Sequence, residues 1–572
     1  MKKHPIYPAR RVFLLSLFVI GLSGLFVRSV YLQLFEHEFL EEEGKARHLR
    51  VVEIPAHRGM VLDRNGELLA VSTPIHSVWA NPLEALQSHK AIRNVALILG
   101  INADSLIKKL QAKKNKQFLY VKRHIGPSQA QKLNKLDAQG IHLKREYRRY
   151  YPTGEVSSHL LGFTDIDDKG LEGIELAYEK WLQGKPGAKK VIKDSFNRVV
   201  EDVEALKIPE PGRDVMLSID RRIQYLAYRE LKAQLTKHRA KAASAVLMDA
   251  KTGEILAMAN TPSFNPNNRK GYSRGTYRNR AVTDVYEPGS TMKPFTVASA
   301  LESQRYTQNT IVDTTPGKYQ IGEFTIRDYR NYGVLTLGGI ILKSSTVGAA
   351  KVAQNIPAQE LWSTFSSIGV GQSTESGFPG EVAGHLKSFH DWHKVEHATM
   401  SYGYGMSMTS LQLARAYSVF ASGGKLLPVS MLRKSAEDLA EVANIPAIFS
   451  PQTVDKVVTM LTAVVSEQGT GSRAAIPGYS VAGKTGTVHK SAKGGYEEDK
   501  YISVFAGLAP ASDPKLVLVV MVNQPNSGMY FGGEVAAPIF SKIMGGALRI
   551  LNISPDKVPL QANVESTQDH AG

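Results

Sequence analysis

The first feature of the sequence is an apolar run near its start. Residues 12–27 carry no charge, and apolar character continues past Arg28 to about residue 34. A helix that spans a bilayer needs about 20 apolar residues, and the long side chain of Arg28 can reach the interface and extend the span. Basic side chains precede the run: Lys2, Lys3, Arg10 and Arg11. The pattern predicts a transmembrane helix over residues 12–34, with residues 1–11 cytoplasmic and the following chain outside.

A cleaved signal peptide and a buried core helix are the alternatives for this segment. No A-x-A type of cleavage site follows the run, which favours a permanent anchor over a signal peptide. The asymmetry of the flanking charges favours an anchor over a core helix.

The chain between the anchor and residue 213 reads as one module of mixed pattern. Asp63–Gly66 is a turn signal between two apolar stretches. Apolar residues recur at helical spacing within residues 84–140, which we expect to be largely helical. Residues 204–213 contain Pro and Gly and read as a linker. We therefore predict a separate elongated module over residues 35–213.

Residues 214–552 have an α/β (α+β) pattern. A turn at Asp249–Gly253 joins two apolar runs, and an apolar helical pattern covers residues 535–551. We expect one mainly antiparallel sheet, flanked by helices, that collects strands from both ends of this region. The expected strands are residues 243–248, 254–259, 501–508 and 516–522. The polar residues 553–572 are predicted to be a disordered tail.

Composition removes several classes of function. The chain has no cysteine, so neither a disulfide framework nor a thiolate nucleophile is available. The net charge of +17 is compatible with nucleic acid, anionic lipid or an acidic polymer. Export makes nucleic acid an unsuitable partner, so the basic stretch at residues 108–123 is interpreted as a solvated or lipid-facing surface. None of the 16 histidines shows metal-ligand spacing, and we expect no metal and no cofactor.

The first candidate for chemistry is Ser290-Thr291-Met292-Lys293. Pro288-Gly289 forms a turn before it, and an apolar helical pattern follows. Ser290 should therefore lie at a helix start, where backbone N–H groups favour developing negative charge. Lys293 lies three residues later on the same face and can accept the proton of the serine hydroxyl if its pKa is low. Alone, this pattern also describes a helix-capping serine beside a surface lysine.

Two further motifs follow in order along the chain. Ser344-Ser345-Thr346 comes after an apolar stretch and alone resembles any polar loop. Lys484-Thr485-Gly486-Thr487 ends another apolar stretch, and a glycine in a strand indicates close approach of a second backbone or a ligand. S-x-x-K, S-D-N and K-T-G in this order are the signature of β-lactamases and penicillin-binding proteins. The trio is far more specific than any one motif.

With these motifs the chain resembles the class B penicillin-binding proteins. Within that class it is most similar to the Gram-negative cell-division (septal) peptidoglycan D,D-transpeptidases of the FtsI type. The resemblance covers residues 10–552. In the N-terminal pedestal (dimerisation-type) module it includes Arg58–Gly66, Arg149–Gly154, Gly170–Glu175 and Leu217–Asp220. In the penicillin-binding transpeptidase domain it includes Ser401–Gly405.

The resemblance implies a role for each motif residue. Ser290 would attack the penultimate D-alanine of a stem peptide, Lys293 would activate it, and Ser344 and Lys484 would relay the proton to the leaving amine. Thr346, Thr485, Gly486 and Thr487 would bind the substrate. Backbone N–H groups of Ser290 and Thr487 would form the oxyanion hole. The resemblance also implies β-lactam binding, a place in the inner membrane at the septum, and divisome partners, chiefly an FtsW-type SEDS glycan polymerase.

One residue departs from the family pattern. The second motif usually ends in asparagine, and here it ends in Thr346. Threonine is shorter and has a single hydroxyl, whereas an asparagine amide offers an acceptor and two donors. The change is compatible with weaker substrate positioning or altered β-lactam affinity, with a neutral variant, or with a degenerate enzyme kept as a scaffold.

Other readings of the sequence remain. A D,D-carboxypeptidase or β-lactamase shares the three motifs but does not need the module at residues 35–213. A weakened paralogue acting as a divisome scaffold would keep the anchor and that module. Residues 478–485 also match the phosphate-loop pattern, although no helix is predicted after Thr485.

Overall fold

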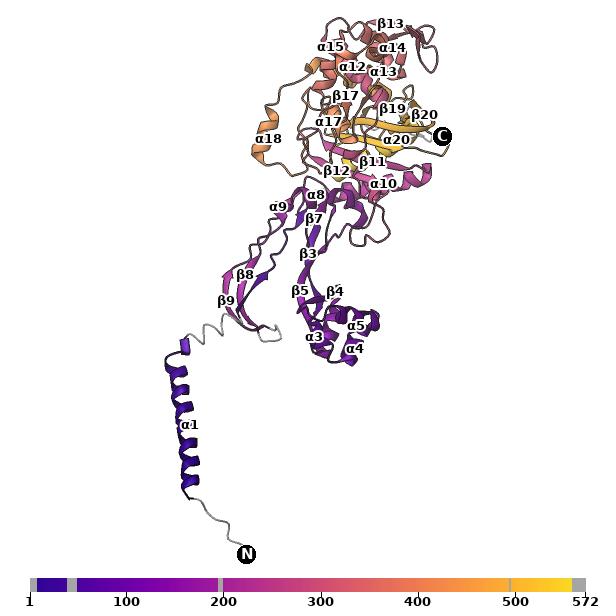
Figure 1. Cartoon of the computed structure of the whole chain (residues 1–572). Helices are drawn as coiled ribbons and strands as arrows, with labels where there is room; N and C mark the ends of the chain where they lie inside the picture. Colours follow the sequence, from indigo (N-terminus) through magenta and orange to yellow (C-terminus); the bar gives the residue numbers. More distant parts are fainter. Residues whose placement is uncertain (1–7, 39–48, 194–198, 493–494, 558–572) are drawn as a thin grey trace, which may run out of the picture. The chain divides into compact units, whose positions relative to one another are not determined.

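The computed structural model describes residues 8–38, 49–193, 199–492 and 495–557 (Figure 1). The chain forms two compact units, each assembled from several segments of the sequence. Unit 1 comprises Met1–His57, Pro74–Arg148 and Gly184–Gly212. Unit 2 comprises Arg58–Thr73, Arg149–Gln183 and Arg213–Gly572.

Helix α1, Pro8–Leu34, contains the predicted anchor. It has no buried residue, and its apolar window has a mean hydropathy of 2.0. Its 27 residues make it long and apolar enough to cross a membrane. The helix begins four residues before the predicted span, because the residues that precede the apolar run, including Arg10 and Arg11, are also helical.

Most of unit 1 is a small set of helices beside three strands. The helices are α3 (Pro82–Ala85), α4 (His89–Leu99), α5 (Ala103–Ala112) and α6 (Pro127–Leu136). The strands are β4 (Leu119–Ile125), β5 (Ile141–Tyr150) and the second half of β3 (Leu68–Ala80). The expectation of a largely helical stretch at residues 84–140 is confirmed for α4–α6. It is wrong for β4, whose aromatic and β-branched residues pair with β3 from Ala80 to His76.

A three-stranded antiparallel sheet completes unit 1. Its order is β1 (Leu49–Ile54), β8 (Gly187–Lys193) and β9 (Val199–Lys207). The predicted linker at residues 204–213 is therefore wrong in its first four residues, which belong to β9. Hydrogen bonding to β8 along the strand outweighs the local Pro and Gly signal.

The segments of unit 2 that precede residue 213 meet around a buried ion cluster. The Glu175 carboxylate accepts hydrogen bonds from Arg58 Nε at 2.8 Å and from Arg149 Nε at 2.6 Å. All three side chains are at least 95% buried. The elements here are β2 (Val61–Leu62), η1 (Gly154–Ser157), α7 (Ser158–Leu161), β6 (Phe163–Thr164), β7 (Gly170–Glu172), α8 (Gly173–Ala177) and α9 (Glu179–Leu182).

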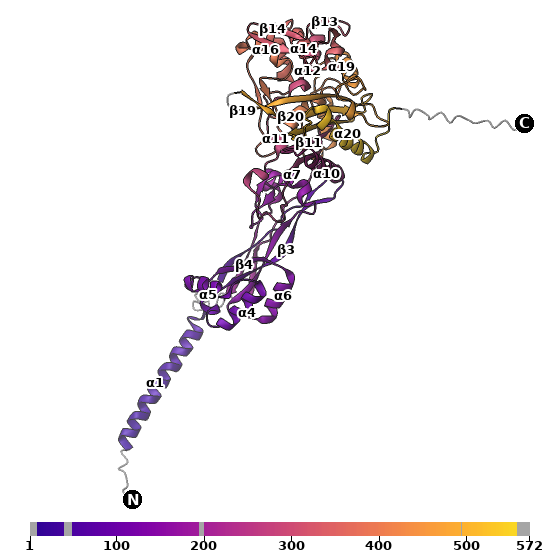
Figure 2. The ribbon, with the colours of Figure 1, turned by 90° about the vertical axis from the view of Figure 1, so that its right-hand side faces the viewer.

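The centre of unit 2 is a five-stranded antiparallel sheet in the order β12-β11-β21-β20-β19 (Figure 2). Its strands are β11 (Ala242–Asp249), β12 (Ile255–Thr261), β19 (Ala482–Ala492), β20 (Gly495–Ala509) and β21 (Leu516–Asn523). The prediction of one sheet built from both ends of this region is confirmed.

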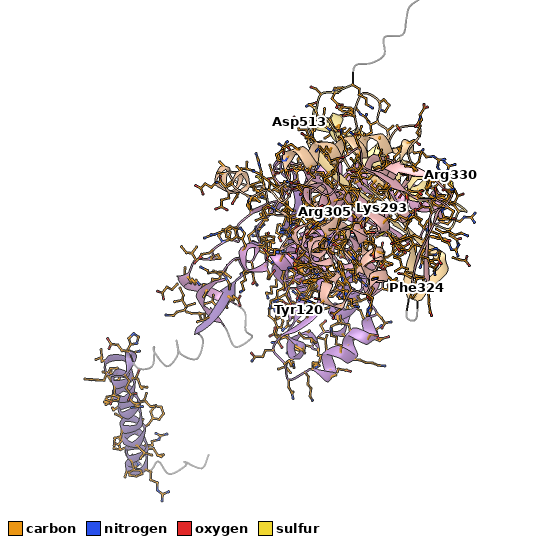
Figure 3. All side chains as sticks on the ribbon, turned by 90° about the horizontal axis from the view of Figure 1, so that it is seen from above. Tyr120, Lys293, Arg305, Phe324, Arg330 and Asp513 are labelled. Atoms are coloured by element: carbon orange, nitrogen blue, oxygen red, sulfur yellow. The ribbon has the colours of Figure 1, made fainter. Side chains whose placement is uncertain are left out.

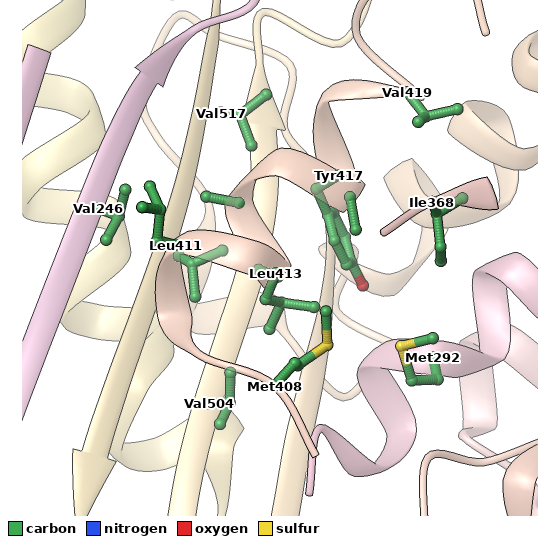
Figure 4. Packing of buried hydrophobic residues seen from close by; sticks show 14 of the residues in the cluster. Val246, Met292, Ile368, Met408, Leu411, Leu413, Tyr417, Val419, Val504 and Val517 are labelled. Carbon is green, nitrogen blue, oxygen red and sulfur yellow. The ribbon is translucent and has the colours of Figure 1, made fainter. Parts of the chain in front are cut away.

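Both faces of this sheet are buried, which explains why its strands appear as continuous apolar runs in the sequence. Val246 and Met248 of β11 face one core cluster, whereas Ala245 and Leu247 face the other. Helices α10 (Arg221–His238) and α20 (Gly532–Ile550) cover the second face. Figure 4 shows the first face, where Leu411 of α17 (Ser410–Ser418) lies beside Val246 of β11. Tyr417 of the same helix points away from the sheet and donates its hydroxyl to the carbonyl of Thr291.

The chain between β12 and β19 is rich in helices and includes α17. Its helices are η2 (Arg274–Thr276), α11 (Arg280–Thr283), η3 (Gly289–Met292), α12 (Lys293–Glu302), α13 (Leu337–Lys343), α14 (Thr346–Gln354), α15 (Ala358–Ser367), η4 (Phe389–Asp391), α16 (Lys394–Met400), α18 (Ala436–Ala443), α19 (Pro451–Val464) and η5 (Ser472–Ala474). Its short strands are β13 (Ile311–Asp313), β14 (Lys318–Ile321), β15 (Phe324–Arg327), β16 (Val334–Thr336), β17 (His385–Leu386) and β18 (Met406–Ser407), and β10 (Val215–Met216) pairs with β2.

The end of the chain is ordered further than the predicted tail implies. Asp556 accepts hydrogen bonds from the backbone N–H of Ser480 and from the hydroxyl of Ser512. Residues 553–557 are therefore held against unit 2, and the rest of the predicted tail lies outside the described residues.

Candidate active site

Ser290 lies in the short helix η3, directly before α12, as the sequence predicts. Gly289 has a φ of +57° and donates its N–H to the carbonyl of Gly403 at 3.1 Å. A Cβ on Gly403 would lie 2.3 Å from the carbonyl oxygen of Gly289, so only glycine permits this approach. The Ser401–Gly405 segment thus shapes the turn that presents Ser290.

Lys293 is fully buried at the start of α12. Its amine donates to the carbonyl of Ser344 and lies 3.2 Å from Thr346 Oγ1 and 3.4 Å from Ser344 Oγ. Burial lowers the pKa of Lys293 to about 7, and the carboxylate of Asp328 partly opposes that shift. A lysine with this pKa can be neutral near pH 7 and can accept a proton.

The second motif occupies the connection between α13 and α14. Ser344 ends α13 with a φ of +57°, and Ser345 caps α14 by accepting the N–H of Gly348 at 2.8 Å. The carboxylate of Asp328 accepts the Ser345 hydroxyl at 2.6 Å and the N–H groups of Thr346 and Val347 at 2.5 and 3.0 Å. One carboxylate therefore holds three donors at the first turn of α14, which keeps Ser344 and Thr346 in place.

The third motif lies in β19, the edge strand of the central sheet. Lys484 is fully buried, and its amine donates to Ser344 Oγ at 3.0 Å. Burial and the nearby amine of Lys293 lower the pKa of Lys484. The hydroxyl of Thr487 accepts the N–H of Gly532 at 2.9 Å, and the hydroxyl of Thr485 lies 2.9 Å from that of Thr470.

Gly486 explains why the third motif can approach the turn that carries Ser290. A Cβ at this position would lie 3.1 Å from both the carbonyl oxygen of Pro288 and the methyl group of Thr291. The glycine in this strand led us to expect close approach of a second backbone. The structure shows that approach, between Gly486 and the turn that carries Ser290.

The three motifs open onto one cavity of about 800 Å³. Ser290, Ser344, Thr346, Thr485 and Thr487 line it, while Lys293 and Lys484 lie buried behind Ser344. A serine at a helix start, two buried amines of low pKa and a row of hydroxyls can together perform nucleophilic acyl transfer.

The phosphate-loop reading of residues 478–485 fails on geometry. A phosphate loop must open a helix at its lysine. Lys484 instead lies inside β19, and the strand continues to Ala492.

Comparison with known proteins identifies the family to which the chain belongs. Residues 243–545 match the family model described as the penicillin binding protein transpeptidase domain, and residues 53–217 match the penicillin-binding protein dimerisation domain. The chain belongs to the class B penicillin-binding proteins. It combines the dimerisation domain with the transpeptidase domain, as the resemblance implied.

Curated relatives and solved structures agree with this family. The peptidoglycan D,D-transpeptidase FtsI of Escherichia coli strain K12 is 42% identical over 94% of this chain and 91% of its own length. The probable peptidoglycan D,D-transpeptidase PbpC of Pseudomonas aeruginosa is 42% identical over 98% of both chains. The apo transpeptidase domain of Burkholderia pseudomallei penicillin-binding protein 3 has 44% identity and a TM-score of 0.55, covering 60% of this chain and 98% of its own.

Sequence reasoning missed the residues that hold the motifs in position. Asp328 lies 18 residues before Thr346 in a stretch without a motif, and Thr470 lies 15 residues before Thr485. Glu287, immediately before Pro288, was also missed. Its carboxylate accepts the N–H of Gly405 at 2.8 Å, and burial raises its pKa. The only available signal for Glu287 was its position beside the Ser290 motif.

Proposed function

We propose that this class B penicillin-binding protein is a peptidoglycan D,D-transpeptidase that cross-links stem peptides through an acyl-enzyme on Ser290 and is acylated by β-lactams. The observation that carries the proposal is the convergence of the Lys293 and Lys484 amines on the hydroxyl of Ser344, with Thr346 held against Lys293, in the cavity that Ser290 lines. The names of the relatives support the same reaction.

In the proposed first step, Ser290 Oγ attacks the carbonyl of the penultimate D-alanine while Lys293 accepts the serine proton. Backbone N–H groups of Ser290 and Thr487 stabilise the oxyanion, an effect worth about 3–4 kcal/mol per donor. Ser344, between the two lysine amines, passes a proton to the leaving D-alanine. Thr485 and Thr487 bind its carboxylate, and Gly486 lets the strand lie beside the nucleophile.

In the second step an amine of another stem peptide attacks the Ser290 ester. The new C–N bond forms, the C–Oγ bond breaks, and the amine proton returns to Ser290 through Ser344. Thr346 contributes a hydroxyl to Lys293 at 3.2 Å, which supports a working site over a degenerate scaffold.

The proposed setting is the inner membrane at the division septum. In this arrangement residues 1–11 are cytoplasmic, residues 12–34 span the membrane, and the pedestal at residues 35–213 and the transpeptidase domain at residues 214–552 are periplasmic. The apolar helix α1 and the basic residues before it support this topology. The proposed partners are divisome proteins, chiefly an FtsW-type SEDS glycan polymerase beside the anchor.

Covalent labelling tests the proposal. The full chain, in detergent, is incubated with a fluorescent penicillin beside its Ser290→Ala variant. We expect a stable fluorescent band that the variant lacks. An unlabelled wild-type protein that still unfolds cooperatively would favour the scaffold, and rapid turnover of the penicillin would favour a β-lactamase.

A further inference from the structure

The walls of the active-site cavity carry an excess of positive charge that the proposed donor chemistry does not use. Arg327, Lys343 and Arg473 line the cavity, against the single carboxylate of Glu534. These three cations are distinct from Lys293 and Lys484, which are buried behind Ser344.

Arg327 comes from the wall that carries the second motif. It is the last residue of β15, and the next residue is Asp328, whose carboxylate is fixed by the first turn of α14. Its side chain is exposed to the cavity. In the part of the chain that the structure describes, its guanidinium makes no ion pair. A free guanidinium on an anchored backbone is well suited to bind a planar anion with two parallel hydrogen bonds.

Arg473 comes from the wall that carries the third motif. It lies in η5, three residues after Thr470, whose hydroxyl contacts that of Thr485. It too is exposed to the cavity and has no ion-pair partner among the described residues. Lys343 joins the two walls, because its amine donates to the carbonyl of Gln468 at 3.1 Å.

The position of Arg473 relates it to the leaving-group side of the reaction, and Arg327 lines the same cavity. In the proposed mechanism Thr485 and Thr487 bind the carboxylate of the departing D-alanine, and Arg473 lies three residues after Thr470, whose hydroxyl contacts that of Thr485. By microscopic reversibility, the incoming amine occupies the side from which the leaving amine departed. The leaving group is an amine whose neighbouring carbon bears a carboxylate, so the acceptor side is suited to amines of the same kind.

We propose that Arg327 and Arg473 complete, together with Thr485 and Thr487, a carboxylate site for the acceptor strand and select amines that carry a neighbouring carboxylate. The inference rests on the proposed transpeptidase function and extends it to the second substrate. The two arginines act in the aminolysis of the Ser290 ester, in which the acceptor amine forms the C–N bond and Ser290 Oγ leaves with its proton restored.

Partition of the acyl-enzyme between two acceptors tests this site. The full chain is acylated with an N-acyl-D-alanyl thioester, which releases a thiol. D-alanine or D-alaninamide is then supplied, and amide product is measured against hydrolysed acid. We expect Arg327→Gln and Arg473→Gln each to lower the transfer-to-hydrolysis ratio for D-alanine about tenfold, because a charge-assisted contact is lost. The ratio for D-alaninamide should change little, since this amine carries no carboxylate.

Arg330→Gln is the matched control. Arg330 lies three residues from Arg327 and is exposed, and Figure 3 shows it at the edge of the view. It does not line the cavity. We expect its transfer ratios to equal those of the wild type.

The outcomes separate the two proposals. If wild-type protein forms no acyl-enzyme with penicillin or thioester, the transpeptidase function fails and this site fails with it. If the acyl-enzyme forms but both arginine variants retain the wild-type ratio for D-alanine, only the acceptor site is overturned. An equal fall for D-alanine and D-alaninamide also overturns it, because the arginines would then shape the cavity without recognising a carboxylate.

Discussion

The amine of Lys293 lies 3.2 Å from the hydroxyl of Thr346, the residue that replaces the usual asparagine of the second motif. The threonine therefore keeps a polar contact with the lysine at that position. It has no amide to offer to a substrate at the same time. At this position Thr346 can therefore position the lysine, but it lacks the amide with which an asparagine could also contact the substrate.

Substitutions at Thr346 separate these roles. Thr346→Val has nearly the same shape without the hydroxyl, and we expect up to about tenfold slower acylation by fluorescent penicillin, because a hydrogen bond between neutral groups is worth about 0.5–1.5 kcal/mol. Thr346→Asn restores an amide, and we expect faster acylation than in the wild type. Unchanged acylation rates in Thr346→Asn would remove the basis for weakened substrate positioning.

The pH dependence of acylation should report Lys293. Its pKa is lowered to about 7, and only the neutral amine can accept the Ser290 proton. The acylation rate should therefore fall as pH drops below about 7. The negative charge of Asp328 raises the pKa of Lys293, so Asp328→Asn should move this acidic limb to lower pH.

A remote carboxylate provides the control for this experiment. Asp313→Asn removes a charge from an exposed residue outside the cavity, and its acidic limb should coincide with that of the wild type. An Asp328→Asn limb at the wild-type pH would show that Asp328 acts only as a structural cap.

The contact between Gly289 and Gly403 should be intolerant of a side chain. In Gly403→Ala the new Cβ would collide with the carbonyl of Gly289 and strain a φ of +81°. Gly423→Ala is the matched control, because its φ is +70° but nothing lies within 4 Å of the new Cβ. We expect the control to cost about 1–2 kcal/mol of stability, because an L-residue is strained at positive φ. Gly403→Ala should cost more and should also slow penicillin acylation at least tenfold. Equal melting temperatures and equal acylation would contradict the role given to Gly403.

The buried ion cluster should be sensitive to loss of one partner. Arg149→Ala leaves the buried carboxylate of Glu175 with reduced compensation, and removal of one partner of a buried pair costs about 3–5 kcal/mol. Lys232→Ala breaks the more exposed pair with Glu155 and should cost at most about 1 kcal/mol. Denaturant midpoints measure both variants, and similar losses would contradict the distinction.

Some features of this protein follow from the local pattern of apolar and polar residues. Continuous apolar runs predicted four of the five strands of the central sheet, because both faces of that sheet are buried; β19 was not among the expected strands. The Pro288-Gly289 turn and the apolar helix after it placed Ser290 at a helix start. Where tertiary pairing competed with local signals, prediction was weaker. Strand β4 forms within a region of helical pattern because it pairs with β3.

The sequence alone determined the order of the three motifs and, through that order, the family and the proposal of Ser290 as nucleophile. Only the tertiary structure decided how the motifs meet. Lys293 reaches Ser344 across 51 residues and Lys484 reaches it across 140. The same holds for Asp328, Thr470, Arg327 and Arg473, which have no motif of their own. Their effect depends on burial and on distances between segments far apart in the chain, and the low pKa of Lys293 exists only because folding removes its amine from water.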